Sequence, residues 1–212
     1  MNDSNPYESL PMIPLWRLVR NRYSRMVYET LSTAGLTVSR MVEYEVDLRE
    51  RASLDGTGPP DVPAQASFHT APARTDPIRR LDLDFSIPVT FLDDEWVIAA
   101  TAGGEAVGRS LVSAGQYPRV DALGGRMTFD GAYIRRVYVH PEWRNRGLAR
   151  RLVAETLRVA NRQFGVDTAT ALIAPDNKPS RWAFEANGFE PVRRHDYLSV
   201  FGREYRRVTG TD

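Results

Sequence analysis

The chain contains 212 residues, with 28 basic and 27 acidic side chains, a formal net charge of +1 at pH 7 and no cysteine. This length suits one domain with a sizeable hydrophobic core and some appendages. The balanced charge excludes the strong basic field of a general nucleic-acid binder, and the lack of cysteine excludes disulfides, thiolate nucleophiles and cysteine-ligated zinc.

The histidine content and the absence of targeting signals exclude further classes of protein. Three histidines, at positions 69, 140 and 195, are too scattered to predict a metal cluster. The first residues lack the basic-then-apolar layout of a signal peptide, and no stretch approaches the roughly 18 apolar residues of a membrane span. We therefore expect a cytoplasmic chain, monomeric or homodimeric, with no metal and no nucleic-acid or membrane partner.

Residues 1–66 are predicted to form an N-terminal extension. Residues 1–14 are polar, and residues 15–34 carry apolar side chains at helical spacing before a glycine. Arginines on this helix could face RNA or anionic lipid, but a solvated surface is the favoured interpretation. Residues 37–48 alternate like a strand, and the Gly, Pro and Asp content of residues 53–66 indicates a linker.

Residues 67–208 are predicted to form the main domain. Strands are expected over residues 91–102, 106–113, 132–139, 168–174, 190–200 and 204–208. Helices are expected over residues 76–84, 148–164 and 180–187, the last with Ser180 as N-cap, and a loop over residues 116–126. This order predicts a mixed α/β fold with a mostly antiparallel central sheet and helices on both faces, after an N-terminal helical extension.

One strand–loop–helix passage carries most of the chemical information. From Val137 to Leu152 an apolar strand, a proline turn, a basic loop and an amphipathic helix follow one another. A helix start attracts anions through its unpaired N–H groups and the positive end of its macrodipole. Gly147 allows close approach of the backbone, while Arg144 and Arg146 add positive charge. The passage therefore favours pyrophosphate binding.

The pattern Arg144-x-x-Gly147-x-Ala149 resembles the acyl-CoA signature of the GNAT superfamily of N-acyltransferases. Residues 177–189 are similar to the family's later helix, which begins near an asparagine and ends in Gly-Phe. The two elements stand in the family's order and at its separation. The resemblance covers roughly residues 66–208, and it implies a sheet that splays apart at the coenzyme A site.

The resemblance implies acetyl-CoA as the co-substrate and direct transfer of its acyl group to an amine. The pantetheine arm would pair with the strand edge before the loop, and a backbone N–H near Val137 or Tyr138 would polarise the thioester carbonyl. Asn177 occupies the family position that binds the arm or an ordered water. The residues implied to bind the cofactor are Val137, Tyr138, Val139, Arg144, Asn145, Arg146, Gly147, Leu148, Ala149, Arg150, Asn177, Arg181 and Phe184.

The residue that removes a proton from the amine departs from the family pattern. Many relatives carry Glu or His eleven residues before the first signature residue, and here that position is Tyr133. Tyr133 would need a lowered pKa to act as a base, which Arg135 could promote. Asp130, acting through a water, and His195 are further candidates.

The second departure concerns the leaving thiolate. Relatives often carry a tyrosine four residues before the Gly-Phe pair, where this chain has Phe184. Tyr138 or Tyr197 could donate the proton instead. A thiolate has a parent pKa of only ~8.5, so it also leaves tolerably without an acid.

The sequence leaves several hypotheses open about the acceptor substrate and the activity. Arg135 and Arg136 could select a carboxylate-bearing amine, although exposed strand positions explain them equally well. The leading hypothesis is an N-acetyltransferase for a primary amine of a small molecule or of a protein. The alternatives are transfer of a longer acyl chain from CoA or an acyl carrier protein, and a non-catalytic acyl-CoA sensor.

Overall fold

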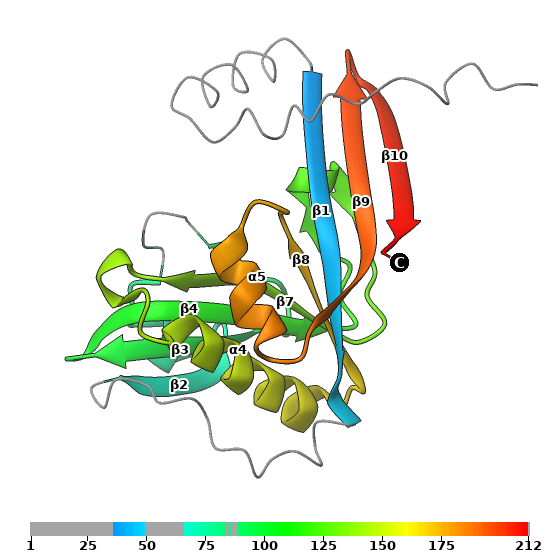
Figure 1. Ribbon diagram of the computed structural model, residues 1–212. Coiled ribbons are helices and arrows are strands. Elements are labelled where there is room, and N and C mark those ends of the chain that lie inside the picture. The colour runs from blue at the N-terminus through cyan, green and yellow to red at the C-terminus, as the bar shows by residue number, and fades with distance from the viewer. Residues whose placement is uncertain (1–35, 50–65, 84, 86–88, 212) are drawn as a thin grey trace, which may run out of the picture.

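The computed structural model describes residues 36–49, 66–83, 85 and 89–211 (Figure 1). The helix predicted over residues 15–34 and nearly all of the predicted linker lie outside this part of the chain. Within the described residues, no helix is both long and apolar enough to cross a membrane.

An eight-stranded sheet forms the centre of the fold. In spatial order its strands are β10 (Arg203–Gly210), β9 (Glu190–Val200), β1 (Leu36–Asp47), β8 (Thr168–Ile173), β7 (Ala132–Val139), β4 (Glu105–Ala114), β3 (Trp96–Ala102) and β2 (Ser67–Pro72). Neighbouring strands of this sheet run antiparallel, except for the parallel pair of β7 and β8. The predicted mixed, mostly antiparallel sheet is confirmed.

Helices cover both faces of the sheet, as expected. Helix α4 (Leu148–Val159) continues through a π-helical turn (Ala160–Phe164) and buries apolar residues spaced three or four apart against the sheet. Helix α5 (Lys178–Glu185) lies on the same side (Figure 1). The single turn α3 (Asp76–Arg79) buries Ile78 against β3 and β4 on the opposite face.

Two elements are shorter than predicted. Strand β3 begins at Trp96 rather than at residue 91, because the two residues before Glu95 form a turn in which Asp94 has a φ of +55°. The helix expected over residues 76–84 ends at Arg79 after one turn. In both cases, polar residues interrupt an element that the apolar pattern would extend.

Strand β1 lies inside the sheet, although it belongs to the segment predicted to be an extension. It pairs with β8 from Val42 to Asp47 and with β9 from Leu36 to Glu45. Every second residue near its end, including Tyr44, joins the core beneath α4. The strand predicted over residues 37–48 is thereby confirmed.

Strands β7 and β8 separate after a short parallel pairing (Figure 1). Their register joins Ala132–Ile134 with Ala169–Ala171 and stops there. At Arg136 the backbone has a φ of +56°, and the register of β7 with β4 shifts between Arg109 and Leu111. In the described part of the chain, the edge of residues 135–139 that faces β8 therefore offers backbone groups without a strand partner.

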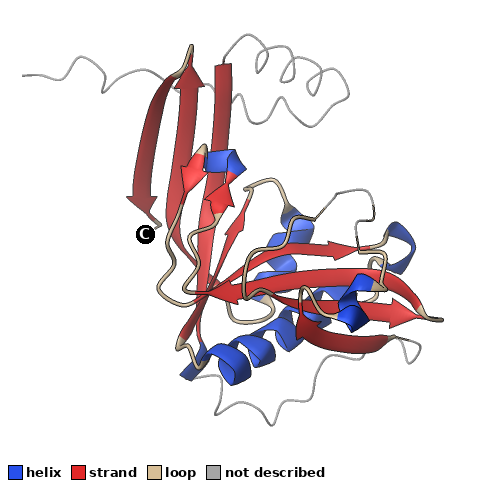
Figure 2. Ribbon diagram, turned by 180° about the vertical axis from the view of Figure 1, so that it is seen from behind, coloured by secondary structure: helices blue, strands red, loops and turns tan. Residues whose placement is uncertain are grey.

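The segment predicted as a loop over residues 116–126 contains a small hairpin instead. Strands β5 (Arg119–Val120) and β6 (Gly125–Arg126) flank a single 3-10 turn. The hairpin packs on the face away from α4 (Figure 2). Val120 shares a hydrophobic cluster with Tyr197 of β9. This hairpin covers the half of the sheet that contains β1 and β9.

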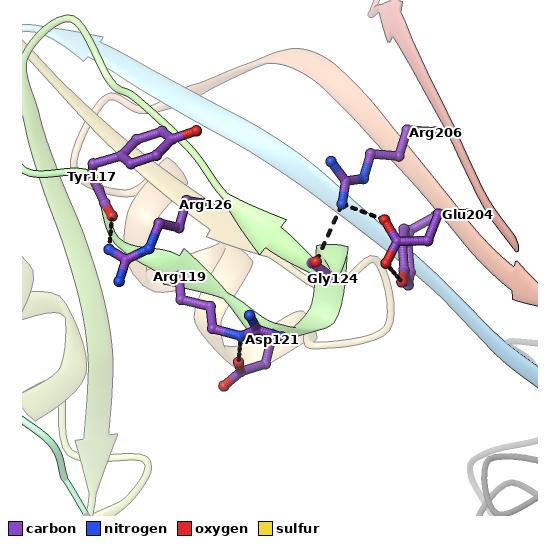
Figure 3. A network of polar contacts seen from close by, with 8 residues as sticks. Tyr117, Arg119, Asp121, Gly124, Arg126, Glu204 and Arg206 are labelled. Carbon is purple, nitrogen blue, oxygen red and sulfur yellow. Dashed lines mark hydrogen bonds and ion pairs between the residues drawn. The ribbon is translucent and has the colours of Figure 1, made fainter. Parts of the chain in front are cut away.

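Polar contacts attach the hairpin to β10 (Figure 3). The Arg206 guanidinium donates to the carbonyl of Gly124 (3.2 Å) and to the Glu204 carboxylate (2.8 Å). Gly124 has a φ of +64°, and a Cβ at this position would lie 2.3 Å from the Tyr197 ring. Only glycine has no Cβ to clash with the ring and also adopts a positive φ without strain.

Candidate functional site

The loop between β7 and α4 presents open hydrogen-bond donors. A 3-10 turn (Pro141–Trp143) follows the strand, and residues 144–147 are exposed. Gly147 is the N-cap of α4 with a φ of +75°, and Arg151 donates its N–H to the Gly147 carbonyl (3.1 Å). The N–H groups before Arg151 consequently point beyond the helix start, where the macrodipole is positive.

Two arginines of this loop fold back onto aromatic rings. Arg144 donates through Nε to the Val139 carbonyl (3.1 Å), and its guanidinium lies 5.7 Å from the centre of the Tyr138 ring. The guanidinium of Arg146 lies 5.2 Å from the centre of the Trp143 ring. The loop thus combines the helix dipole, open N–H donors and two cationic side chains, which together suit a diphosphate.

Tyr138 lies on the unpaired part of β7, and its side chain is on the face away from α4. Its ring is 4.8 Å from the Phe85 ring, and the buried Arg109 guanidinium lies 5.6 Å from its centre. Val137 and Val139 project to the other face and pack against the core under α4. The unpaired edge of β7 therefore lies between two different faces of the sheet. One face is covered by α4, and the other carries aromatic rings and the Arg109 guanidinium.

Tyr133 is buried and stacks on Phe129, with ring centres 4.1 Å apart. Burial is the main cause that raises the pKa of Tyr133 to about 12, and it outweighs the opposite effect of Arg135. The hydroxyl therefore stays protonated at neutral pH, which suits a donor and opposes base catalysis. Asp130, three residues earlier, is exposed.

Arg135 is held by a buried carboxylate. Its guanidinium donates to both oxygens of Glu95 (2.7 and 2.8 Å) and to the Thr90 carbonyl (2.7 Å). Glu95 in turn accepts from the Leu92 N–H (3.1 Å). This ion pair fixes the segment before β3 against β7, whereas Arg136 is exposed beside it.

His195 lies three strands away from β7 in the sheet order. Neighbouring strands are about 4.8 Å apart, which places β9 roughly 14 Å from β7. His195 Nε2 lies 2.6 Å from Glu43 Oε2, and Arg193 lies 3.0 Å from the other oxygen of the same carboxylate. The structure therefore does not bring His195 together with Tyr133.

Helix α5 is capped by Asn177, not by Ser180 as expected. The Asn177 side chain accepts from the Ser180 N–H (3.3 Å), so the helix begins at Lys178. This bond engages the side chain of the residue that the family resemblance assigns to the pantetheine arm or an ordered water. Arg181 donates to the Pro175 carbonyl (3.4 Å) and lies 3.5 Å from Glu185.

Phe184 is buried in the core, edge-to-face with Phe189 at 4.8 Å. The buried Asn187, which the sequence did not single out, donates to the carbonyls of Arg150 (2.9 Å) and Ala183 (2.7 Å). Asn187 thus fastens the end of α5 to the first turn of α4. No group of three or more potential metal-ligating side chains occurs among the residues that the structure describes.

The acetyltransferase (GNAT) family model matches residues 65–189, more than half of the chain. The chain therefore belongs to this family, whose members are acyl-CoA-dependent acyltransferases. None of the curated proteins compared with the chain matches it.

Several solved structures share the fold. A Drosophila protein aligns with a TM-score of 0.55 and 14% identity, over 85% of this chain and 58% of its own. A tandem GNAT protein from the clavulanic acid biosynthesis pathway aligns with a TM-score of 0.55 and 19% identity, over 97% and 63%. A GCN5-related N-acetyltransferase from Kribbella flavida aligns with a TM-score of 0.51 and 16% identity, over 82% and 63%. The chain thus spans 58–63% of the length of these three structures.

Proposed function

We propose that the chain is an N-acetyltransferase that moves an acetyl group from acetyl-CoA to a primary amine of a small molecule or of a protein. The observation that carries this proposal is the open start of α4 directly after the unpaired edge of β7. A diphosphate and an amide-bearing arm need these two features side by side, and family membership supports the same assignment.

The residues present fit this co-substrate. The N–H groups of residues 147–150 face a diphosphate position with Arg144 and Arg146 beside it, and no side chain at Gly147 blocks the approach. The edge of residues 137–139 has no strand partner on the β8 side and is suited to pair with the amides of the pantetheine arm, although its Val139 carbonyl already accepts from Arg144 Nε. When bound, acetyl-CoA supplies an activated thioester carbonyl, and a backbone N–H near Val137 is our candidate for polarising it.

We assign the acceptance and donation of protons to fewer residues than the sequence analysis named. A primary amine with a pKa of ~10.4 needs roughly 4.6 kcal/mol to become neutral at pH 7. We assign proton acceptance to Asp130 acting through water, since Tyr133 stays protonated. Tyr138, beside the unpaired edge, is our candidate proton donor. We assign Phe184 and Arg181 to the packing and support of α5.

The test is release of thiol from acetyl-CoA with a panel of primary amines, compared with octanoyl-CoA under the same conditions. We expect amine-dependent release that is faster with acetyl-CoA. Faster release with octanoyl-CoA would instead support the longer-chain alternative. No release above hydrolysis with any amine class would contradict the proposed activity.

A non-catalytic acyl-CoA sensor is the second candidate. Two observations favour it: the raised pKa of Tyr133 and the burial of Phe184, which stand at the positions where many relatives handle protons. Tight acetyl-CoA binding by calorimetry without turnover of any amine would support the sensor and exclude the enzyme.

A further inference from the structure

Three side chains form a row across the face of the sheet that lies away from α4. Tyr133 of β7 is in register with Thr170 of β8, which is in register with Glu45 of β1. Their sequence neighbours on each strand belong to the core beneath α4, so the three side chains project to the other side. The row crosses the sheet at the point where β7 and β8 begin to separate.

Glu45 differs from the other carboxylate on the same face of β1. Glu43 is paired with His195 (2.6 Å) and with Arg193 (3.0 Å). Glu45 is half-buried, and its carboxylate has no hydrogen bond or ion pair with the side chain of a described residue. Its register partner on β9 is Glu190, another carboxylate. Like charges directly opposite on neighbouring strands are destabilising, and a cation between them would remove the repulsion.

Buried hydroxyl groups stand next to Glu45. Thr170 is 2% exposed and Tyr133 is 9% exposed, and neither hydroxyl bonds to a described residue. An ammonium group has three N–H donors and needs oxygen acceptors, which a carboxylate and a threonine hydroxyl supply together. With strands about 4.8 Å apart, Glu45 lies roughly 10 Å from Tyr133 across the row.

We propose that Glu45 and Thr170 bind a positively charged group of the acceptor, so that the chain selects amines carrying a second ammonium group. The second ammonium group sits at Glu45, and the other amine extends toward the separation of β7 and β8. This inference rests on the proposed acyltransferase function. It places an acceptor residue on β1, outside residues 65–189 that the family model matches.

The affinities of three four-carbon amines for the full chain, measured by calorimetry, test the proposal. The three amines share one amino group and differ only at the opposite end of the carbon chain. They are 1,4-diaminobutane, butylamine and 4-aminobutanoate, which carry a positive, a neutral and a negative group there. We expect diaminobutane to bind about tenfold to a hundredfold more tightly than butylamine, the loss expected when one charge-assisted hydrogen bond is missing. The carboxylate of 4-aminobutanoate should be rejected.

Glu45→Gln should abolish the preference for diaminobutane, and it should raise KM for this amine without changing KM for acetyl-CoA. Glu105→Gln, at an exposed residue at the start of β4, is the control and should keep the preference. Glu45→Gln should unfold at no lower temperature, because it removes the repulsion from Glu190.

The proposal is overturned if the unmodified chain does not bind diaminobutane, binds butylamine as tightly, or keeps its preference in Glu45→Gln. If the unmodified chain prefers diaminobutane but does not turn over acetyl-CoA with any amine, the proposed activity is contradicted. The proposed amine-binding site at Glu45 is still supported in that case.

Discussion

Replacing Gly147 by valine tests the coenzyme A site most directly. Gly147 caps α4 with a φ of +75°, a backbone conformation that a β-branched residue rarely adopts. Valine must either accept this strain or turn the backbone, and its side chain would occupy the space through which an anion reaches the N–H groups. We expect the variant to fold with an intact core, since residue 147 is exposed.

The size of the effect follows from the donors that the loop loses. A charge-assisted hydrogen bond contributes about 1.5–3 kcal/mol. Displacing two of the N–H groups at the start of α4 from the diphosphate would thus cost about 3–6 kcal/mol. This corresponds to an affinity for coenzyme A that is roughly a hundredfold to more than ten-thousandfold weaker.

Calorimetric titration with coenzyme A measures this loss, and Gly165→Val is the matched control. Gly165 follows the other end of the same helix with a φ of +60°, and a Cβ there meets no atom within 4 Å. Valine at 165 therefore brings the same backbone strain far from the loop, and we expect a lower stability with unchanged affinity. An equal affinity in the two valine variants would refute the assignment of the diphosphate to the start of α4.

Three further predictions concern buried polar groups near the site. Because the pKa of Tyr133 rises from 10.0 to about 12 in the folded chain, this hydroxyl contributes roughly 3 kcal/mol of stability below pH 10 that is lost as the pH rises toward 12; urea unfolding should show a shallower loss of stability with pH in Tyr133→Phe. Glu95→Gln should lower the free energy of unfolding by about 3–5 kcal/mol, because Arg135 then keeps an uncompensated buried charge. Adding Arg135→Met to that variant should restore much of the loss, and a variant pair without recovery would contradict this reasoning. Ser113→Ala should stabilise the chain by about 1 kcal/mol in urea unfolding, because the buried Ser113 Oγ has no hydrogen-bond partner in the described structure; a destabilised variant would show that this oxygen is satisfied.

The features that the sequence predicts correctly are local ones. The amphipathic spacing of α4, its start at Leu148 and the strand before it all lie within residues 132–165, so near neighbours along the chain determine them. The hairpin of β3 and β4 is also locally determined, because the adjacent glycines Gly103 and Gly104 between the two predicted strands favour a tight turn. The short strands β5 and β6 were not predicted, because two residues are too few to show the alternating pattern of a strand.

Contacts between distant segments could not be predicted. Glu95 bonds to Arg135 across 40 positions, and Glu43 bonds to His195 across 152 positions. Each pair depends on the order of strands in the sheet, which residue spacing does not encode. Tyr133 illustrates the consequence: a nearby arginine suggested a lowered pKa, but burial has the larger and opposite effect.

The position of β1 between β8 and β9 has a consequence for how the protein is made. This strand leaves the ribosome first among the described strands, while both of its neighbours follow more than a hundred residues later. Folding rates fall as the contacts that complete a structure become more distant in sequence. A nascent chain should therefore expose an unpaired strand edge until residues 168–200 have been synthesised, which makes it dependent on protection from aggregation during that interval.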